Sequence, residues 1–294
     1  MVVAIFIAIN TVGSVPLIIS MFNNPEALDK LALNPNDLTP LGLDPNLALV
    51  YMLFPFMVGL AAFILLVKPL NFRTFIEIIN GTKTFRWNRF VISGLVWTAI
   101  SALYLFISIK LDPENFTLNN TTTTLIPLII VSVLMIPFQA AFEEVLFRGY
   151  LMQGFTLLIR NRFFPLVITS ALFGLMHGLN PEVKEFGFWT MMPQYVLFGL
   201  IFGVMTILDD GIETAMGAHA ANNAFLCIML TNEASALQTP ALYEQQSIRP
   251  WTEFTAMLLM GIVILLILKI IFRWKTFSAL FSEVESKRSD IYTG

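Results

Sequence analysis

The sequence predicts an all-α protein: a polytopic bundle of about eight transmembrane helices that forms one domain over residues 1–294, with both termini in the cytoplasm. Two observations lead to this prediction. Apolar residues make up 56% of the chain and charged residues only 13%, whereas soluble domains carry about 25% charged residues. The apolar residues are also gathered into runs of roughly 20, which is the length that spans the hydrocarbon core of a bilayer.

Eight apolar runs are long enough to cross a bilayer, and polar or charged segments separate them. The first three belong to an N-terminal group of transmembrane helices, residues 1–124, and the next four to a central part, residues 125–231. The last run opens the C-terminal part, residues 252–294, which ends in a predicted cytoplasmic tail. The predicted spans are 2–21, 47–68, 90–110, 125–153, 163–179, 188–208, 212–231 and 252–272.

Basic residues are concentrated in every second connection between the predicted spans. Lysine and arginine are frequent in residues 68–89, in the turn at 160–162 and from Lys269 onward. Loops rich in these residues stay in the cytoplasm, so the pattern predicts a multi-pass membrane protein with both termini in the cytoplasm. The short loops favour a prokaryotic plasma membrane. The short turn at Asp209-Asp210 is predicted to be cytoplasmic although it has no basic residue. The mainly acidic or polar connections, which we expect on the outer side, are 22–46, 112–124, 182–185 and 232–251.

Charge and cysteine content exclude several classes of protein. The net charge is −3 at pH 7, and the chain has no basic arm or arginine-rich helix, so nucleic-acid binding has no support. The single cysteine, Cys227, cannot form an intrachain disulfide framework or a cysteine-rich zinc site. The lipid bilayer is the first partner that the sequence predicts.

The fourth predicted span contains two carboxylates and a guanidinium, Glu143, Glu144 and Arg148. Ionisable residues within a membrane span are costly and indicate function by default. In a helix Glu144 shares a face with Arg148, whereas Glu143 points about 100° away. We therefore expect Arg148 to pair with Glu144 and Glu143 to be available as a base. A packing network in a transporter or an inert membrane protein is the alternative reading of the same residues.

Both histidines of the chain, His177 and His219, lie in apolar segments that favour helix. His219 and Asn223 are four residues apart and share a helix face, and the alanines and glycine around them allow close approach of neighbouring helices. A carboxylate, two imidazoles and a carboxamide from three helices supply the groups needed for water activation and oxyanion stabilisation. A peptide bond is one target that suits this set.

Three short motifs in order resemble those of the CAAX protease and bacteriocin-processing family (CPBP, also called Abi), which includes the type II CAAX prenyl endopeptidases. The first is Glu-Glu-x-x-x-Arg at residues 143–148. The second is Phe-x-x-x-His, formed by Phe173 and His177. The third is His-x-x-x-Asn, formed by His219 and Asn223. The resemblance covers roughly residues 125–231, which would be the catalytic core.

This resemblance implies an intramembrane endopeptidase that uses a glutamate and needs no metal or other cofactor. Glu143 and His177 would activate a water, and His219 and Asn223 would stabilise the oxyanion. The residues that would support the site are Glu144, Arg148 and Phe173, the last of which we expect to pack against His177. The implied substrate is a CAAX-like tail, or a peptide or membrane-protein precursor with or without a lipid anchor.

Two other functions use the same residues. Glu143, His177 and His219 could hold a zinc or iron ion in a metal-dependent protease, although the chain has no His-Glu-x-x-His pair. A bacteriocin-immunity or transport protein would bind a partner without cleaving it. We expect the cavity to open toward the cytoplasm or sideways into the lipid, since Glu143 and His219 lie nearer the predicted cytoplasmic ends of their helices.

Overall fold

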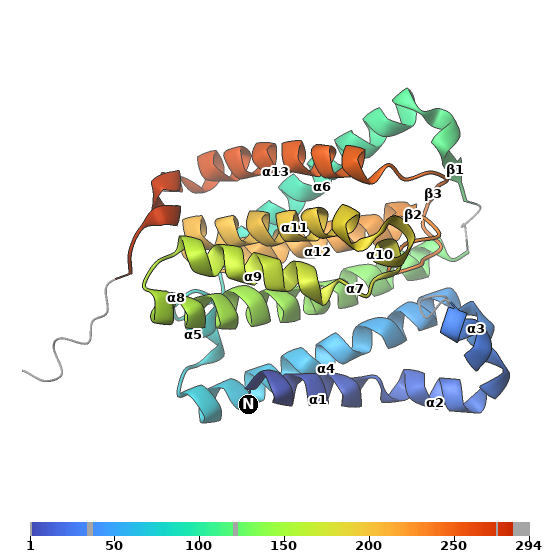
Figure 1. The fold of residues 1–294 in the computed structure, drawn as a ribbon, viewed down its shortest axis with the longest axis horizontal. Helices are drawn as coiled ribbons and strands as arrows, with labels where there is room; N and C mark the ends of the chain where they lie inside the picture. Colours follow the sequence, from blue (N-terminus) through green and yellow to red (C-terminus); the bar gives the residue numbers. More distant parts are fainter. Residues whose placement is uncertain (1, 34–37, 120–122, 275, 285–294) are drawn as a thin grey trace, which may run out of the picture.

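The computed structural model describes residues 2–33, 38–119, 123–274 and 276–284, and these are mostly helical. The predicted connections at 34–37 and 120–122, residue 275 and most of the tail, 285–294, lie outside the described residues. The longer helices run side by side along the long axis of the molecule (Figure 1). The prediction of a mainly helical protein is therefore confirmed for the part of the chain that the structure describes, whereas the small three-stranded sheet described below was not predicted.

Among the described residues, five helices are long and apolar enough to cross a membrane, judged by length and composition. Each corresponds to one predicted span. The third of them is continuous over Leu125–Ile159 and consists of α7 (Leu125–Glu144), a π-helical stretch (Val145–Met152) and α8 (Gln153–Ile159). The others are α4 (Pro45–Asn71), α6 (Trp87–Leu111), α11 (Phe188–Asp209) and α13 (Pro250–Phe272).

The other three predicted spans form shorter helices, so the number of eight stays a prediction. The run 2–21 divides into α1 (Val2–Gly13) and α2 (Val15–Asn23), with a proline in the first turn of α2, where its missing N–H costs nothing. The run 163–179 forms the 14-residue α9 (Phe163–Met176). The run 212–231 forms the 17-residue α12 (Glu213–Met229), after which the chain becomes extended.

Helix α12 occupies the centre of the bundle and contacts α6, α7 and α11. Its small residues make this possible: a Cβ atom added at Gly217 would lie 2.0 Å from the carbonyl oxygen of Phe90 on α6. Outside this centre, α9 packs on α11, α4 packs on α7, and α1 packs on α4. Small residues thus bring α12 close enough to its neighbours to share a polar site with them.

A small sheet closes one end of the bundle. It contains β1 (Phe116–Leu118), β3 (Tyr243–Gln245) and β2 (Leu230–Thr231) in that order, and β3 is antiparallel to β1 and parallel to β2. Helices α3 (Leu28–Leu33) and α10 (Pro181–Phe186) lie at the same end (Figure 1). We call this the strand end. The short 3₁₀ turns of the chain are Pro25–Ala27, Thr39–Leu41, Pro113–Asn115 and Phe277–Phe281.

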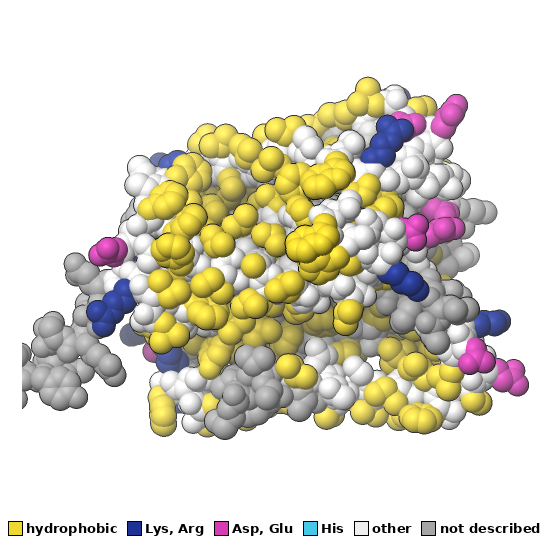
Figure 2. All heavy atoms as spheres, viewed as in Figure 1, with side chains coloured by type: hydrophobic (Ala, Val, Ile, Leu, Met, Phe, Trp, Pro, Cys, Tyr) yellow, Lys and Arg dark blue, Asp and Glu magenta, His cyan; other side chains and the backbone are white. Residues whose placement is uncertain are grey.

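The opposite end, which we call the basic end, holds the segments 68–89, 160–162 and 269–273. It includes α5 (Phe75–Ile79) and the α8–α9 turn (Figure 1). Figure 2 shows that hydrophobic side chains cover the middle of one face, whereas charged side chains gather toward the two ends. Large apolar side chains on the spans are well exposed, among them Leu65 at 74% and Leu134 at 61%. This distribution suits a protein surrounded by lipid.

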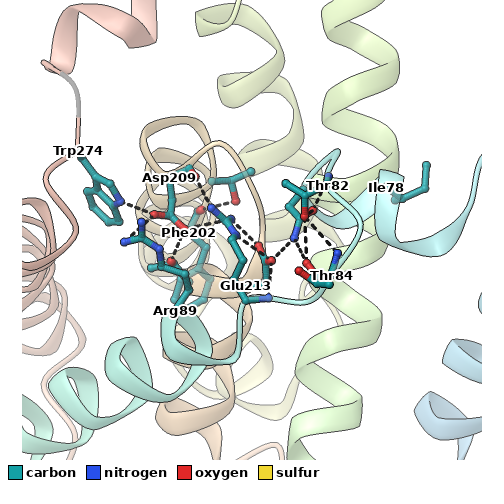
Figure 3. Close-up of polar contacts among 12 residues, drawn as sticks. Ile78, Thr82, Thr84, Arg89, Phe202, Asp209, Glu213 and Trp274 are labelled. Carbon is teal, nitrogen blue, oxygen red and sulfur yellow. Dashed lines mark hydrogen bonds and ion pairs between the residues drawn. The ribbon is translucent and has the colours of Figure 1, made fainter.

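A polar network ties the helices together at the basic end (Figure 3). The Arg86 guanidinium donates to both carboxylate oxygens of Glu213, at 2.9 and 2.6 Å, and lies 3.2 Å from Asp209 Oδ2. Trp274 Nε1 and Thr214 Oγ1 also donate to the Asp209 carboxylate, at 2.6 and 2.7 Å. Asp209 and Glu213 are both buried, so this network joins α6, α11, α12 and the segment after α13.

Candidate active site

A cavity of about 560 Å³ lies among the helices, and all four residues predicted to be catalytic line it. Glu143 comes from α7 and His177 from the end of α9, whereas His219 and Asn223 come from α12. The packing of small residues on α12 lets these groups approach one another. The structure therefore brings together residues that are up to 80 positions apart in the sequence.

The Glu143 carboxylate has two differently placed oxygens. Its Oε1 accepts a hydrogen bond from Gln139 Nε2 at 2.5 Å, one turn earlier on α7. Its Oε2 lies 3.7 Å from His219 Nε2 and has no hydrogen-bond partner within the described part of the chain. The side chain is only 4% exposed. One oxygen is thus fixed by the protein, and the other is available to a reacting group in the cavity.

Glu144 pairs with Arg148 as the helix geometry predicts, and neither residue is among those that line the cavity. Glu144 Oε1 accepts from Arg148 Nη1 at 2.7 Å, and both side chains are fully buried. Arg148 Nη2 donates to the Gly199 carbonyl oxygen at 3.0 Å, and the guanidinium lies over the Phe173 ring at 4.6 Å. The pair therefore joins α7 and its π-helical extension to α9 and α11.

Glu144 also contacts His219, which the sequence did not predict. His219 Nδ1 lies 2.8 Å from Glu144 Oε1. Because this carboxylate is an acceptor, Nδ1 carries the proton, and Nε2 is directed to the side of Glu143. The His219 ring is stacked on Phe202 at 4.9 Å. Glu144 thus fixes both the orientation of the imidazole and the proton on its Nδ1.

His177 was predicted to lie inside the span 163–179. In the structure it lies just beyond the end of α9. The helix ends at Met176, and Asn180, which precedes Pro181, has the extended backbone that residues before proline favour. His177 Nδ1 is 2.8 Å from the Phe173 carbonyl oxygen, so Nε2 remains available to the cavity. The ring stacks on Tyr195 at 4.6 Å.

Phe173 packs between the two imidazoles, as expected for His177. Its ring centroid lies 4.7 Å from that of His177 and 5.9 Å from that of His219. It is buried, it lines the cavity, and the Arg148 guanidinium lies 4.6 Å from its ring centroid. Phe173 therefore contacts both the buried ion pair and the histidines of the cavity.

Gln139 is the site residue that the sequence reasoning missed. Besides donating to Glu143, it accepts a hydrogen bond from Asn223 Nδ2 at 2.9 Å. Asn222 in turn donates to Asn223 Oδ1 at 2.9 Å and accepts from Trp97 Nε1 at 3.2 Å. Gln139 could have been identified in the sequence as a carboxamide in an apolar helix, one turn before Glu143. It was missed because only the ionisable residues of this span were considered as site candidates.

If the site cleaves peptides as the motif resemblance implies, replacing Gln139 by leucine should lower kcat by about 10- to 100-fold, because a hydrogen bond to a charged group is lost on one side and the Asn223 amide is released on the other. Steady-state kinetics with a fluorogenic peptide would measure this. Ser132→Ala, which changes a buried polar residue of the same helix outside the cavity lining, is the matched control. An unchanged kcat in Gln139→Leu would contradict the assignment.

A second polar group lies beside His177; the sequence reasoning considered its member Asn180 as a possible hydrogen-bonding residue of the site but missed Tyr195 and Glu182. Asn180 Nδ2 donates to the Tyr195 hydroxyl at 3.1 Å, and Glu182 Oε1 accepts from the Ala236 backbone N–H at 3.0 Å. All three side chains line the cavity. Burial raises the pKa of Glu182 above its ordinary value.

The raised pKa of Glu182 predicts a pH-dependent stability. The folded state holds this proton more tightly than the unfolded chain does, so the contribution to stability is complete below the ordinary value of 4.5 and is lost as the pH rises through the raised pKa. Glutamine has no such proton. We therefore expect the difference in melting temperature between Glu182→Gln and the wild type to change in favour of the variant as the pH is raised above 4.5.

Thermal unfolding of the purified protein in detergent over a pH series would measure the difference. Glu185→Gln removes the same charge from an exposed position of the same helix and serves as the control. A difference between Glu182→Gln and wild type that stays constant across the series would contradict the prediction.

Each of the two histidines of the site has a hydrogen-bond partner at Nδ1. Nδ1 of His219 faces Glu144, and Nδ1 of His177 faces a backbone carbonyl. In the described ranges of the chain, no group of three or more His, Cys, Asp or Glu side chains is placed to hold a metal ion. The alternative in which Glu143, His177 and His219 hold a metal ion stays a prediction.

The cavity extends toward the strand end. Its lining includes Phe116, Leu230 and Gln245 of the three strands and Asn232 of the following connection. The polar network around Asp209 at the basic end is not part of the lining that the structure describes. The Glu144–Arg148 pair also lies outside this lining, and the expected opening toward the cytoplasm or sideways into the lipid stays a prediction.

The fold and the site define a class of protein: a helical, multi-pass membrane protein with a carboxylate, two imidazoles and a carboxamide in one cavity. Residues 122–225 match a protein family described as type II CAAX prenyl endopeptidase Rce1-like. This match confirms the resemblance that the three motifs predict. It covers the helices that carry Glu143, His177, His219 and Asn223.

The chain is also similar to the uncharacterized protein YyaK of Bacillus subtilis (strain 168). The two sequences are 30% identical over 164 residues, which are 55% of this chain and 54% of YyaK. The chain thus matches about half the length of this curated relative. No solved structure matches the chain.

Proposed function

We propose that the chain is an intramembrane endopeptidase that hydrolyses a peptide bond with a water activated by Glu143 and His177, without a metal ion. The catalytic core would be residues 125–231, and the substrate a peptide or membrane-protein precursor. The observation that supports this most is the free Oε2 of Glu143, 3.7 Å from His219 Nε2, in the cavity that His177 and Asn223 also line. The family match over the same helices adds support.

In the first step Glu143 accepts a proton from the water, which His177 positions, and the water oxygen attacks the peptide carbonyl carbon. The C=O electrons move to the oxygen and give a tetrahedral oxyanion. In the second step this intermediate collapses, the C–N bond breaks, and Glu143 returns the proton to the leaving nitrogen. Each proton and electron pair is accounted for by groups in the cavity.

His219 and Asn223 would stabilise the oxyanion. With Nδ1–H donating to Glu144, His219 offers a second donor, Nε2–H, in its imidazolium form. Asn223 Nδ2 has two N–H groups, of which one donates to Gln139, so the other can serve the oxyanion. Donors held in place before the reaction are the most effective kind of charge stabilisation in enzymes.

The test is cleavage of a labelled peptide library by purified protein in detergent, for wild type, Glu143→Ala and His219→Ala, each with and without chelator. We expect both variants to lose cleavage and the chelator to have no effect. Chelator sensitivity would favour the metal-dependent protease. Absence of cleavage by wild type on a broad library would favour the immunity or transport function.

A further inference from the structure

We infer that Trp97 of α6 is a positioning residue for the proposed reaction, because its indole N–H fixes the direction of a series of four hydrogen bonds that ends on Glu143. The inference rests on the proposed function, since it concerns how Glu143 and Asn223 are held. Trp97 lies outside residues 122–225, which match the family, and outside the cavity lining that the structure describes. It would therefore act on the reaction only through other residues.

The four hydrogen bonds connect three helices, α6, α12 and α7, and we call them the amide relay. Trp97 Nε1 donates to Asn222 Oδ1 at 3.2 Å, and Asn222 Nδ2 donates to Asn223 Oδ1 at 2.9 Å. Asn223 Nδ2 donates to Gln139 Oε1 at 2.9 Å, and Gln139 Nε2 donates to Glu143 Oε1 at 2.5 Å. Each of the three amides thus accepts through its oxygen and donates through its nitrogen, in the same direction.

The two ends of the amide relay determine this direction. An amide side chain can turn over and exchange its oxygen and nitrogen with almost no change in shape, so three amides alone can be connected either way. The indole N–H is only a donor, so it requires the oxygen of Asn222, which in turn sets the orientation of Asn223 and Gln139. A carboxylate loses its purely accepting character on protonation, whereas an indole stays a donor. Trp97 is therefore the end that keeps the direction throughout the reaction.

This direction serves both catalytic groups that the amide relay reaches. Asn223 accepts through Oδ1 and donates one N–H to Gln139, so its second N–H remains for the oxyanion. A turned-over amide would offer its oxygen instead and repel the developing negative charge. On Glu143, Oε1 already faces an N–H of Gln139, so the proton taken from water goes to Oε2, the oxygen without a partner among the described residues.

Close packing of α6 on α12 places the indole beside its acceptor. A Cβ atom added at Gly94 would lie 3.2 Å from the carbonyl oxygen of Gly217, and Trp97 follows Gly94 by one turn. The indole is fully buried and packs on the Phe202 ring at 5.4 Å. Hydrogen bonds in such a low-dielectric interior strengthen one another along a series. The predicted catalytic core, residues 125–231, would thus be incomplete without α6.

The kinetic test makes the same substitution at two buried tryptophans of one hydrophobic cluster. Trp97→Phe removes the first donor of the amide relay and keeps an aromatic ring. Trp274→Phe removes an indole donor to Asp209 outside the cavity lining and is the matched control. We expect both variants to have a lower melting temperature. Only Trp97→Phe should lower kcat, by about 10-fold with KM nearly unchanged, because a hydrogen bond that supports the transition state is weakened.

Asn222→Leu tests the amide relay with the indole left in place. This variant removes the acceptor of Trp97 and the donor to Asn223, so kcat should fall at least as far as in Trp97→Phe. Adding Trp97→Phe to it should change kcat by less than about twofold, since the two residues act through one series. Wild-type kcat in Trp97→Phe, an equal loss in Trp274→Phe, or full additivity in the double variant would overturn the inference.

Nuclear magnetic resonance tests the amide relay without any need for cleavage. Protein labelled with ¹⁵N-tryptophan gives one indole N–H signal for each of its five tryptophans, and the signal of Trp97 is the one lost in Trp97→Phe. We expect this signal to shift in Gln139→Leu, three hydrogen bonds away, because bonds in a series polarise one another. Ser132→Ala, a buried change on the same helix as Gln139, should leave it in place.

An unchanged Trp97 signal in Gln139→Leu would overturn the inference. Absence of cleavage by the wild-type protein would instead overturn the proposed function, and the resonance result alone would then decide whether Trp97 directs the amide relay.

Discussion

Glu143→Gln is expected to reduce kcat by about 1,000-fold, because a general base contributes on the order of 10²- to 10⁴-fold to a reaction rate. Glutamine keeps the shape of the side chain and the position beside Gln139 but cannot accept a proton from water. The free oxygen beside His219 is the atom that would take this proton. Cleavage of a fluorogenic peptide in detergent, followed as kcat and KM separately, measures the effect.

The control for this variant is Glu185→Gln, which removes a carboxylate from an exposed position outside the cavity lining. We expect it to retain wild-type kcat. Thermal unfolding of Glu143→Gln should show a folded protein, because a neutral side chain is less costly to bury than a carboxylate. Wild-type kcat in Glu143→Gln would rule out Glu143 as the base.

Arg148→Met is expected to lower the free energy of unfolding by about 3 to 5 kcal/mol, the usual cost of removing one partner of a buried ion pair. Methionine has a similar length, so little packing volume is lost. The cost arises because the fully buried Glu144 loses its counter-charge and the Gly199 carbonyl loses its donor. Unfolding in mixed detergent micelles by increasing denaturing detergent would measure it.

Two further variants show whether the charge or the packing is responsible. Arg249→Met, at an exposed position of the strand end, should change stability by less than about 1 kcal/mol. Glu144→Gln combined with Arg148→Met should recover part of the loss, because the buried charge of Glu144 is then removed together with its partner. If the double variant is no more stable than Arg148→Met, the loss comes from packing.

Helical spacing was sufficient to separate the two glutamates. The 100° between neighbouring residues predicts that Glu144 pairs with Arg148 and that Glu143 faces elsewhere. The structure has this pairing, and of the two neighbouring glutamates Glu143 lines the cavity whereas Glu144 does not. The spacing alone could not identify the face that meets the cavity. That depends on where α12 and α9 pack, which is set by contacts between residues far apart in the sequence.

Two features needed the tertiary structure. The contact of His219 with Glu144 joins residues 75 positions apart, and no local pattern gives their distance. The polar bridge through Gln139 was detectable as a carboxamide one turn before Glu143, but its partner Asn223 is on another helix. Sequence patterns therefore predicted the chemical groups of the site, whereas their hydrogen-bond partners came from helix packing.

Helix lengths were the least predictable part of the fold. Hydropathy alone gives residues 163–179 as one span, yet α9 ends at Met176 and leaves His177 at its end. The signals were Gly178 and the Asn180-Pro181 pair, which disfavour helix.

The cavity is lined by α4, α6, α7, α11, α12 and α13 together, so a molecule bound in it would contact most of the bundle at once. A ligand that binds only the folded state adds its binding free energy to stability, about 2.7 kcal/mol at 100 times its dissociation constant. Filling the cavity should therefore raise the melting temperature whether or not the bound molecule is cut. Candidate substrates and inhibitors can then be ranked by thermal shift before any product is detected.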